Sequence, residues 1–399
     1  MLVLLVAAGC GQNPPPINNP CESDPAGCQP VYIGSATCVA CHANFSAWHS
    51  LHGHSQALKL IEGEAPQSPG SSGAPGVPNP PAGLAWTDLR LVVGGYTKYA
   101  NFVGSQGFLL TDGAGGPLVQ YTLPFLVSLA PGGFVPLTAS AAATTPYDFE
   151  CFRCHTTGPQ SLAANGGLHQ ENRPGLQGTW ALEGVQCEAC HGPGSVHIQN
   201  PSADNIQIDS SQAACGRCHG NPVDPQQLPA ANGFVVGTLQ WAEVLASPHA
   251  DFACTVCHEP HASVIYDRDN GVRNACQNCH PTANMARHEN KVLAQGDYAE
   301  FLSCRSCHMP PAGRNGSSTI IGQARIGDTR THIINIDIMN HDFRAMLTAD
   351  GQQVARDANG KAAVTVDMVC LRCHNGGGSA FALDLRAAAA IAEGIHNPP

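Results

Sequence analysis

The stretch Cys187-Glu188-Ala189-Cys190-His191 is one of eight copies of the pattern Cys-x-x-Cys-His in this chain of 399 residues. The copies occupy residues 38–42, 151–155, 187–191, 215–219, 254–258, 276–280, 304–308 and 370–374. Together they use sixteen of the 19 Cys in the chain. A random chain of this composition would contain far less than one copy, so this repeated pattern decides the interpretation of the sequence.

The spacing fits covalent attachment of haem c. Two thiols three positions apart reach the two vinyl groups at one edge of a porphyrin, and the adjacent His then binds the iron as the proximal ligand. We therefore predict eight haem c groups. Their attachment cysteines are Cys38, Cys41, Cys151, Cys154, Cys187, Cys190, Cys215, Cys218, Cys254, Cys257, Cys276, Cys279, Cys304, Cys307, Cys370 and Cys373. Their proximal iron ligands are His42, His155, His191, His219, His258, His280, His308 and His374.

Three other uses of paired cysteines explain the pattern less well. Zinc sites are built from Cys and His, but zinc chemistry does not require a His directly after every second Cys. A disulfide framework predicts varied spacing and no accompanying His. A thioredoxin-like motif occurs once and needs a βαβ context.

Composition sets the expected fold class. Only 6% of the residues are aromatic and 12% are charged, whereas Gly (43) and Pro (31) are abundant, which favours loops and short elements. We predict a mainly α fold with much irregular structure, organised around eight covalent haems and carrying a small antiparallel β insert. The net charge of −11 argues against nucleic acid as a partner, since such proteins need a basic surface.

The first thirty residues suggest export. Residues 2–8 form a short apolar run that is too short to span a bilayer, and the following Gly9-Cys10 resembles the lipobox of a bacterial lipoprotein signal. No Lys or Arg precedes the run, so a buried N-terminal strand with an inert Cys stays open. We predict lipid on Cys10, a disulfide between Cys21 and Cys28, and a periplasmic or outer-membrane or extracellular lipoprotein.

The haem motifs are spaced unevenly, which suggests a division of the chain. The expected segments are a lipoprotein signal (1–9), a disordered tether (10–30), a first haem segment (31–64), a linker (65–83), a β-rich insert (84–145), a six-haem core (146–310) and an irregular segment with the eighth haem and a C-terminal helix (311–399). Helices are expected at 42–60, 284–303 and 378–394, and a strand at 331–336.

Several stretches resemble the multihaem c-type cytochrome superfamily that includes the nitrification tetrahaem cytochromes and the hydroxylamine oxidoreductases. They are Tyr32-Ile33-Gly34-Ser35 before Cys38, His52-Gly53-His54-Ser55 after Trp48, residues 184–197 ending in Ser195-Val196-His197, Ser247-Pro248-His249 before Cys254, and Cys307-His308-Met309-Pro310 followed by His332. The resemblance covers most of residues 31–374. It implies that several of the eleven remaining His are distal iron ligands.

The candidate distal ligands that this resemblance implies are His54, His197, His249, His261, His288 and His332. His49 and His52 are alternatives to His54, and His169, His341 and His396 are expected to face solvent. Eleven His are enough to supply a sixth ligand to each of the eight haem irons. A haem iron with two His ligands serves as an electron carrier, whereas an iron with an open sixth position can bind a substrate.

Three functions follow from these features. The favoured one is electron transfer through mostly bis-His haems between redox-partner proteins outside the cytoplasm. The second is a multihaem oxidoreductase that acts on a small nitrogen or sulfur compound, as the resemblance to hydroxylamine oxidoreductases implies. The third is a structural subunit of an extracellular conductive oligomer or filament.

Overall fold

The computed structural model describes residues 29–111, 119–122, 132–136, 144–221, 224–237, 239–285 and 287–396. The fold contains 23% helix and 21% strand, with much irregular structure between them. The expected irregular structure is therefore confirmed, but a mainly α fold is wrong, because the gaps between haem motifs contain sheets and hairpins. The predicted lipid site at Cys10 and the predicted Cys21–Cys28 disulfide lie outside the described residues.

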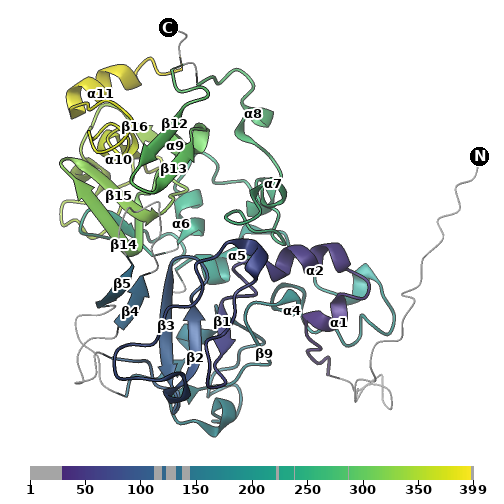
Figure 1. The fold of residues 1–399 in the computed structure, drawn as a ribbon. Coiled ribbons are helices and arrows are strands. Elements are labelled where there is room, and N and C mark those ends of the chain that lie inside the picture. The colour runs from purple at the N-terminus through teal and green to yellow at the C-terminus, as the bar shows by residue number, and fades with distance from the viewer. Residues whose placement is uncertain are drawn as a thin grey trace, which may run out of the picture.

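The first sheet has five antiparallel strands in the order β1-β2-β3-β4-β5 (Figure 1). Their bounds are Leu58–Leu60 (β1), Leu89–Gly94 (β2), Tyr99–Gly104 (β3), Val119–Thr122 (β4) and Gly133–Pro136 (β5). Gly94 begins the tight turn into β3 with a φ of +77°, and an added Cβ there would lie 2.5 Å from the carbonyl oxygen of Tyr99. Strands β2 to β5 lie where the sequence predicts a β-rich insert, and β1 joins them from the first haem segment.

A second sheet follows the order β10-β11-β14-β15 and lies in the upper left of Figure 1. Its strands are Ala230–Ala231 (β10), Phe234–Val236 (β11), Gly313–Ile321 (β14) and Ala324–Thr329 (β15). Four two-stranded sheets pair Val292–Gln295 (β12) with Tyr298–Phe301 (β13), Ile336–Asp337 (β16) with Val364–Thr365 (β17), Tyr147–Asp148 (β6) with Leu176–Gln177 (β8), and Thr156–Thr157 (β7) with Leu182–Glu183 (β9).

The helices are short. Their bounds are Ser35–Cys38 (α1), Ala43–Ser50 (α2), Phe149–Phe152 (α3), Cys187–His191 (α4), Gln212–His219 (α5), Gln240–Leu245 (α6), Arg268–Gly271 (α7), Cys276–Cys279 (α8), Cys304–His308 (α9), Val366–Val369 (α10) and Leu385–Ala392 (α11). Single 3-10 turns occupy Gly70–Ser72, Trp86–Asp88, Gln170–Asn172, Ala203–Asn205, Cys254–Val256 and Phe343–Met346. Within the described ranges, no helix is both long and apolar enough to cross a membrane.

The predicted helices and the late strand are only partly observed. The helix expected at 42–60 is limited to α2, and that expected at 378–394 is α11, where the Asp384 side chain accepts from the Ala387 N–H at 2.7 Å. The helix expected at 284–303 is wrong, since exposure alternates along β12 and β13 as in a half-buried hairpin. The strand expected at 331–336 is reduced to β16.

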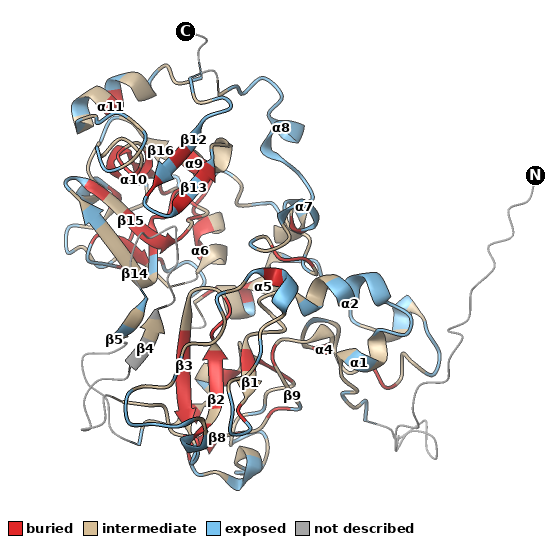
Figure 2. Ribbon diagram, viewed as in Figure 1, coloured by how far each residue is buried: buried red, intermediate tan, exposed pale blue. Residues whose placement is uncertain are grey.

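Buried apolar side chains form several small clusters instead of one large core. One cluster joins β10, β11, α6 and α10 and packs against Cys307 and Cys370, and another joins the first sheet to Phe152 and packs against Cys151. Figure 2 shows the buried strands in red and the exposed α8 in pale blue. The haem motifs therefore border the small cores, as expected where a porphyrin completes the packing.

A glycine inside one motif permits close helix packing, which gives a stability prediction. An added Cβ at Gly216 in α5 would lie 2.0 Å from the indole ring of Trp241 in α6. Gly216→Ala is therefore expected to lower the free energy of unfolding by about 1–3 kcal/mol through overpacking, measured by denaturant titration. Gly53→Ala is the control, because an added Cβ there meets nothing within 4 Å. Equal losses of unfolding free energy in Gly216→Ala and Gly53→Ala would contradict this explanation.

Candidate haem sites

Local helical structure brings the three chemical groups of each motif onto one turn. In four motifs the backbone N–H of the His donates to the carbonyl oxygen of the first Cys at 2.9–3.0 Å. These are the motifs at 38–42, 254–258, 276–280 and 370–374. Residues at i, i+3 and i+4 then share one helix face, so both thiols and the imidazole project together. One thiol differs: Cys41 is disulfide-bonded, so its predicted thioether requires that this disulfide be absent.

Seven of the eight proximal imidazoles lie opposite a second imidazole. The pairs and their ring-centre distances are His42–His197 (6.3 Å), His219–His54 (5.9 Å), His191–His261 (6.1 Å), His280–His249 (6.1 Å), His258–His332 (6.1 Å), His374–His288 (6.1 Å) and His308–His396 (6.0 Å). Two imidazoles that each place a nitrogen about 2 Å from one metal ion have ring centres about 6 Å apart. The pairs therefore fit the two axial positions of a six-coordinate haem iron.

The second nitrogen of many of these imidazoles is held by the protein. The Nδ1 atoms of His191, His308, His374 and His396 lie 2.7–2.9 Å from backbone carbonyl oxygens, those of Gln207, Ile334, Phe381 and Asn284 respectively. A carbonyl oxygen can only accept, so each Nδ1 carries the proton and Nε2 has its lone pair available for iron. This arrangement is typical of metal-binding imidazoles.

The histidine pairs show which of the candidate distal ligands lie opposite a proximal His. All six candidate distal ligands lie opposite a proximal His. His396, expected to face solvent, forms the seventh pair, and nothing in its spacing from a motif signals this. His49 and His52 belong to no proximal pair: the Nε2 of His49 lies 2.9 Å from the carbonyl oxygen of Val185, and His52 packs on His54 with ring centres 4.3 Å apart.

His155 differs from the other seven proximal ligands. All 19 His lie in the described ranges, and none of them pairs with the ring of His155 across a haem-sized gap. Its Nδ1 lies 3.3 Å from the carbonyl oxygen of Ala57, so Nε2 is again the nitrogen available for iron. The expectation that the surplus of His closes every sixth position is therefore not met at the 151–155 motif.

A polar cluster from both sheets lies beside this motif. Tyr99 of β3 lies beside the Asn315 side chain and is close enough to Cys154 for the two groups to interact electrostatically. Burial raises the pKa of Tyr99, so its hydroxyl keeps its proton at neutral pH. The preceding Lys98 donates to Thr329 Oγ1 at 2.9 Å, and burial lowers the pKa of its ammonium.

Two features show that hydrogen bonds and burial hold this polar cluster in place. Asp328 of β15 is buried and accepts backbone N–H groups from Asn315, Gly316 and Ser317 at 2.7–2.8 Å. These bonds fix the start of β14, which carries Asn315. The Asn315 side-chain nitrogen is buried without a hydrogen-bond partner in the described part of the chain, as is the hydroxyl of Tyr147. The cluster therefore retains unused polar groups beside the unpaired His155.

Contacts between cysteines order the motifs in space. Several pairs of thiols from different motifs lie close enough to influence each other's pKa. The pairs with the most direct contact are Cys38–Cys187, Cys154–Cys218, Cys215–Cys254 and Cys276–Cys304. Electrostatic contacts also join Cys190 to Cys215, Cys257 to Cys276, and Cys307 to Cys373. The motifs thus follow the order 38–42, 187–191, 215–219, 254–258, 276–280, 304–308 and 370–374, and 151–155 branches from 215–219.

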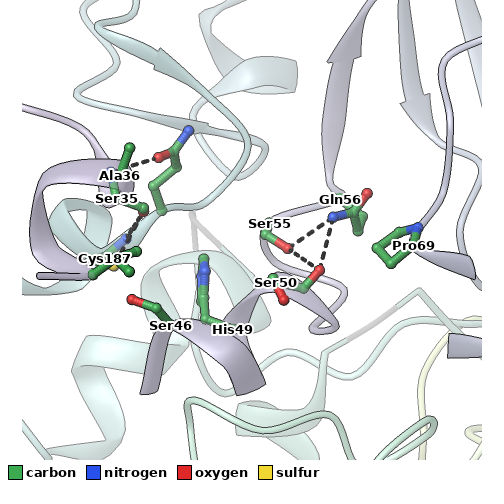
Figure 3. Close-up of a pocket in the computed structure, with 11 residues that line it drawn as sticks. Ser35, Ala36, Ser46, His49, Ser50, Ser55, Gln56, Pro69 and Cys187 are labelled. Carbon is green, nitrogen blue, oxygen red and sulfur yellow. Dashed lines mark hydrogen bonds between the residues drawn. The ribbon is translucent and has the colours of Figure 1, made fainter. Parts of the chain in front are cut away.

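An open cavity lies where the first two motifs of this series meet. It has a volume of about 350 Å³ and is lined by Ser35, Val39, His49 and Cys187, among others (Figure 3). The hydroxyl of Ser35 contacts the Cys187 thiol at 3.2 Å, and α1 and α2 form one wall. The cavity therefore gives the vinyl-binding thiol of Cys187 room for a bulky group beside the first motif.

Comparison with known families supports the haem interpretation. The cytochrome c3 family matches residues 179–281, and the family of cytochrome c554 and c-prime matches residues 137–192. The C-type polyheme cytochrome OmcB of Geobacter sulfurreducens is 24% identical over 238 residues, which cover 60% of this chain and 26% of OmcB. The chain thus spans about a quarter of the length of that curated relative.

Solved structures extend the comparison to the fold. The octaheme sulfite reductase MccA of Wolinella succinogenes superposes with a TM-score of 0.55 at 20% identity, covering 93% of this chain and 68% of MccA. The outer cell wall cytochrome OcwA gives a TM-score of 0.49 at 15% identity, covering 90% of this chain and 86% of OcwA. The repeated attachment motifs, the paired imidazoles and the two family matches lead to one conclusion: the chain is a multihaem c-type cytochrome, a protein that binds haem c.

Proposed function

We propose that this cytochrome holds eight haems, conducts electrons through seven of them, and exchanges these electrons with a small nitrogen or sulfur compound at the 151–155 motif. The observation that carries the proposal is the contrast between seven proximal His with a partner imidazole and His155 without one. A bis-His iron serves electron transfer, whereas an iron with one protein ligand can bind a substrate. The sequence alone favours a pure electron carrier, whereas the unpaired His155 favours the oxidoreductase.

The order of the motifs supports a conducting role. Thioether cysteines mark one edge of each porphyrin, and the contacts between cysteines bring the edges of neighbouring haems together. Haem c supplies one-electron oxidation and reduction at each site. The protein holds the imidazoles through their Nδ1 hydrogen bonds and keeps the motifs in sequence. The 151–155 motif lies at a branch end, where electrons would leave the series or enter it.

The polar cluster supports chemistry at that end. Reduction of a small oxidised nitrogen or sulfur compound consumes protons together with electrons. The Tyr99 hydroxyl keeps its proton and lies beside Asn315, so it is our candidate proton donor. Lys98, with a pKa lowered by burial, releases a proton more readily than an exposed lysine and is the candidate for resupply.

Covalent haem attachment takes place outside the cytoplasm, so we place the protein in the periplasm or at the cell exterior, where redox-partner proteins would dock. Lipid on Cys10 would tether it to a membrane. The net charge of −11 suits a partner with a basic docking surface. A role as a structural subunit of a conductive oligomer is not favoured by any contact in the described ranges.

The test is turnover by the purified holoprotein with a reduced viologen as donor, or a dye as acceptor, and sulfite, nitrite, hydroxylamine or tetrathionate as substrate. Sulfite is included because MccA, whose fold is similar, is a sulfite reductase. The proposal is supported if the protein turns over one of these compounds and if one equivalent of cyanide per chain abolishes this turnover. If the protein is inactive toward all four compounds and binds no cyanide, then it is a pure electron carrier and the proposal is wrong.

A further inference from the structure

A buried ion network lies at the other end of the motif series. The Glu300 carboxylate of β13 accepts from the guanidinium groups of Arg372 and Arg330, each at 2.9 Å. Ser306 Oγ donates to it at 2.6 Å, and the hydroxyl of Tyr298 also donates to it. Glu300 is 5% exposed and Arg372 is 1% exposed. Water is therefore largely excluded from these charges, so their electrostatic effects act over longer distances than on the surface.

The network connects two attachment motifs. Ser306 directly precedes Cys307, and Arg372 directly precedes Cys373, so both are variable residues of a Cys-x-x-Cys sequence. One carboxylate thus binds the motif at 304–308 and the motif at 370–374 at the same time. The thiols of Cys307 and Cys373 lie within electrostatic range of each other. The network is therefore placed between the attachment edges of two neighbouring haems.

The network carries a net positive charge. Burial alone would raise the pKa of Glu300, but Arg372, Arg330 and the hydrogen bonds from Ser306 and Tyr298 lower it to about 2. The carboxylate is therefore ionised at neutral pH, and it neutralises only one of the two guanidinium groups. Within the described ranges, Nε of Arg372 is buried without a hydrogen-bond acceptor. One uncompensated positive charge is thus left between the two motifs.

We propose that Glu300, Arg330 and Arg372 set the reduction potentials of the haems at 304–308 and 370–374 and hold these haems at a fixed spacing. A positive charge in a poorly hydrated interior favours the less positive ferrous iron, so it raises both potentials. This inference rests on haem attachment at these two motifs and on the electron-transfer part of the proposed function. It does not depend on a reaction at the 151–155 motif.

The test is spectroscopic potentiometric titration of the holoprotein and its Glu300→Gln, Arg330→Gln and Arg372→Gln variants, with haem content measured for each. Glu300→Gln is expected to raise two of the eight potentials, and each Arg variant to lower them. Each change should be at least tenfold in the one-electron reduction equilibrium, which is about 59 mV. The double variant Glu300→Gln/Arg330→Gln restores the net charge and is expected to return both potentials close to the wild-type values.

Potential shifts of opposite sign in the Glu and Arg variants distinguish an electrostatic role from a merely structural one. Disruption of the fold would shift the potentials of the Glu and Arg variants in the same direction, and that result would overturn the proposal, as would unchanged potentials in all variants. Arg330 lies outside both motifs, so its variant keeps the test decisive if Arg372→Gln binds too little haem. Arg344→Gln is the matched control, since the Arg344 side chain is 75% exposed and its charge is screened by water.

Discussion

Tyr99→Phe is expected to lower the turnover number for the small-molecule substrate by about 100-fold, the loss typical of removing a proton donor. The variant keeps the aromatic ring, so the packing of β3 is preserved, but the hydroxyl beside Asn315 is lost. Electron delivery through the seven paired sites does not involve this hydroxyl. Steady-state assays with a reduced viologen, compared with pre-steady-state haem reoxidation, measure the two effects separately.

Tyr266→Phe is the control for Tyr99→Phe. The Tyr266 hydroxyl donates to the backbone carbonyl oxygen of Tyr96 at 2.6 Å. Its variant is expected to retain full turnover. Cyanide binding is expected to be preserved in both variants, because the axial position itself is unchanged. Undiminished turnover in Tyr99→Phe would remove Tyr99 from the proposed reaction and leave the proton donor to be found elsewhere in the cluster.

His396→Ala is expected to create a second ligand-accepting haem. The ring of His396 lies 6.0 Å from that of His308 and nearly parallel to it, at 11°. Loss of this imidazole leaves the iron at 304–308 with a single protein ligand. Cyanide stoichiometry, measured by the shift of the Soret band, should rise from one to two equivalents per chain. The electron paramagnetic resonance spectrum should gain one high-spin signal.

His341→Ala is the matched control for His396→Ala, since the sequence predicts that both His341 and His396 face solvent, and His341 pairs with no proximal His in the structure. Its cyanide stoichiometry should stay at one. If His396→Ala also stays at one equivalent, then His396 is not the sixth ligand, and the histidine pairs do not report axial ligation.

The attachment motifs can be recognised in the sequence because each is a local feature. The residues Cys-x-x-Cys-His need only one helical turn to converge, and that turn is encoded within five residues. Candidate distal ligands such as His197 and His249 can also be chosen from the sequence, because they stand in segments that resemble known ones. All six candidates of this kind lie opposite a proximal imidazole.

Features that depend on distant parts of the chain are not predictable in this way. The pairing of His396 with His308 joins positions 88 residues apart, and no local signal marks it. The absence of a partner for His155 is visible only once every other imidazole has been placed. The sequence does not signal the hairpin of β12 and β13, because its buried face contains the polar Gln295 and Glu300, which the ion network and nearby loops satisfy.

In the proposed function, one haem of this cytochrome, and only the one bound at 151–155, lacks a sixth protein ligand. Quantitative electron paramagnetic resonance of the oxidised holoprotein tests it most directly. The account predicts one high-spin signal per eight haems, with seven low-spin bis-His haems, and loss of the high-spin signal on adding one equivalent of cyanide. A spectrum in which all haems are low-spin, unchanged by cyanide, would contradict it.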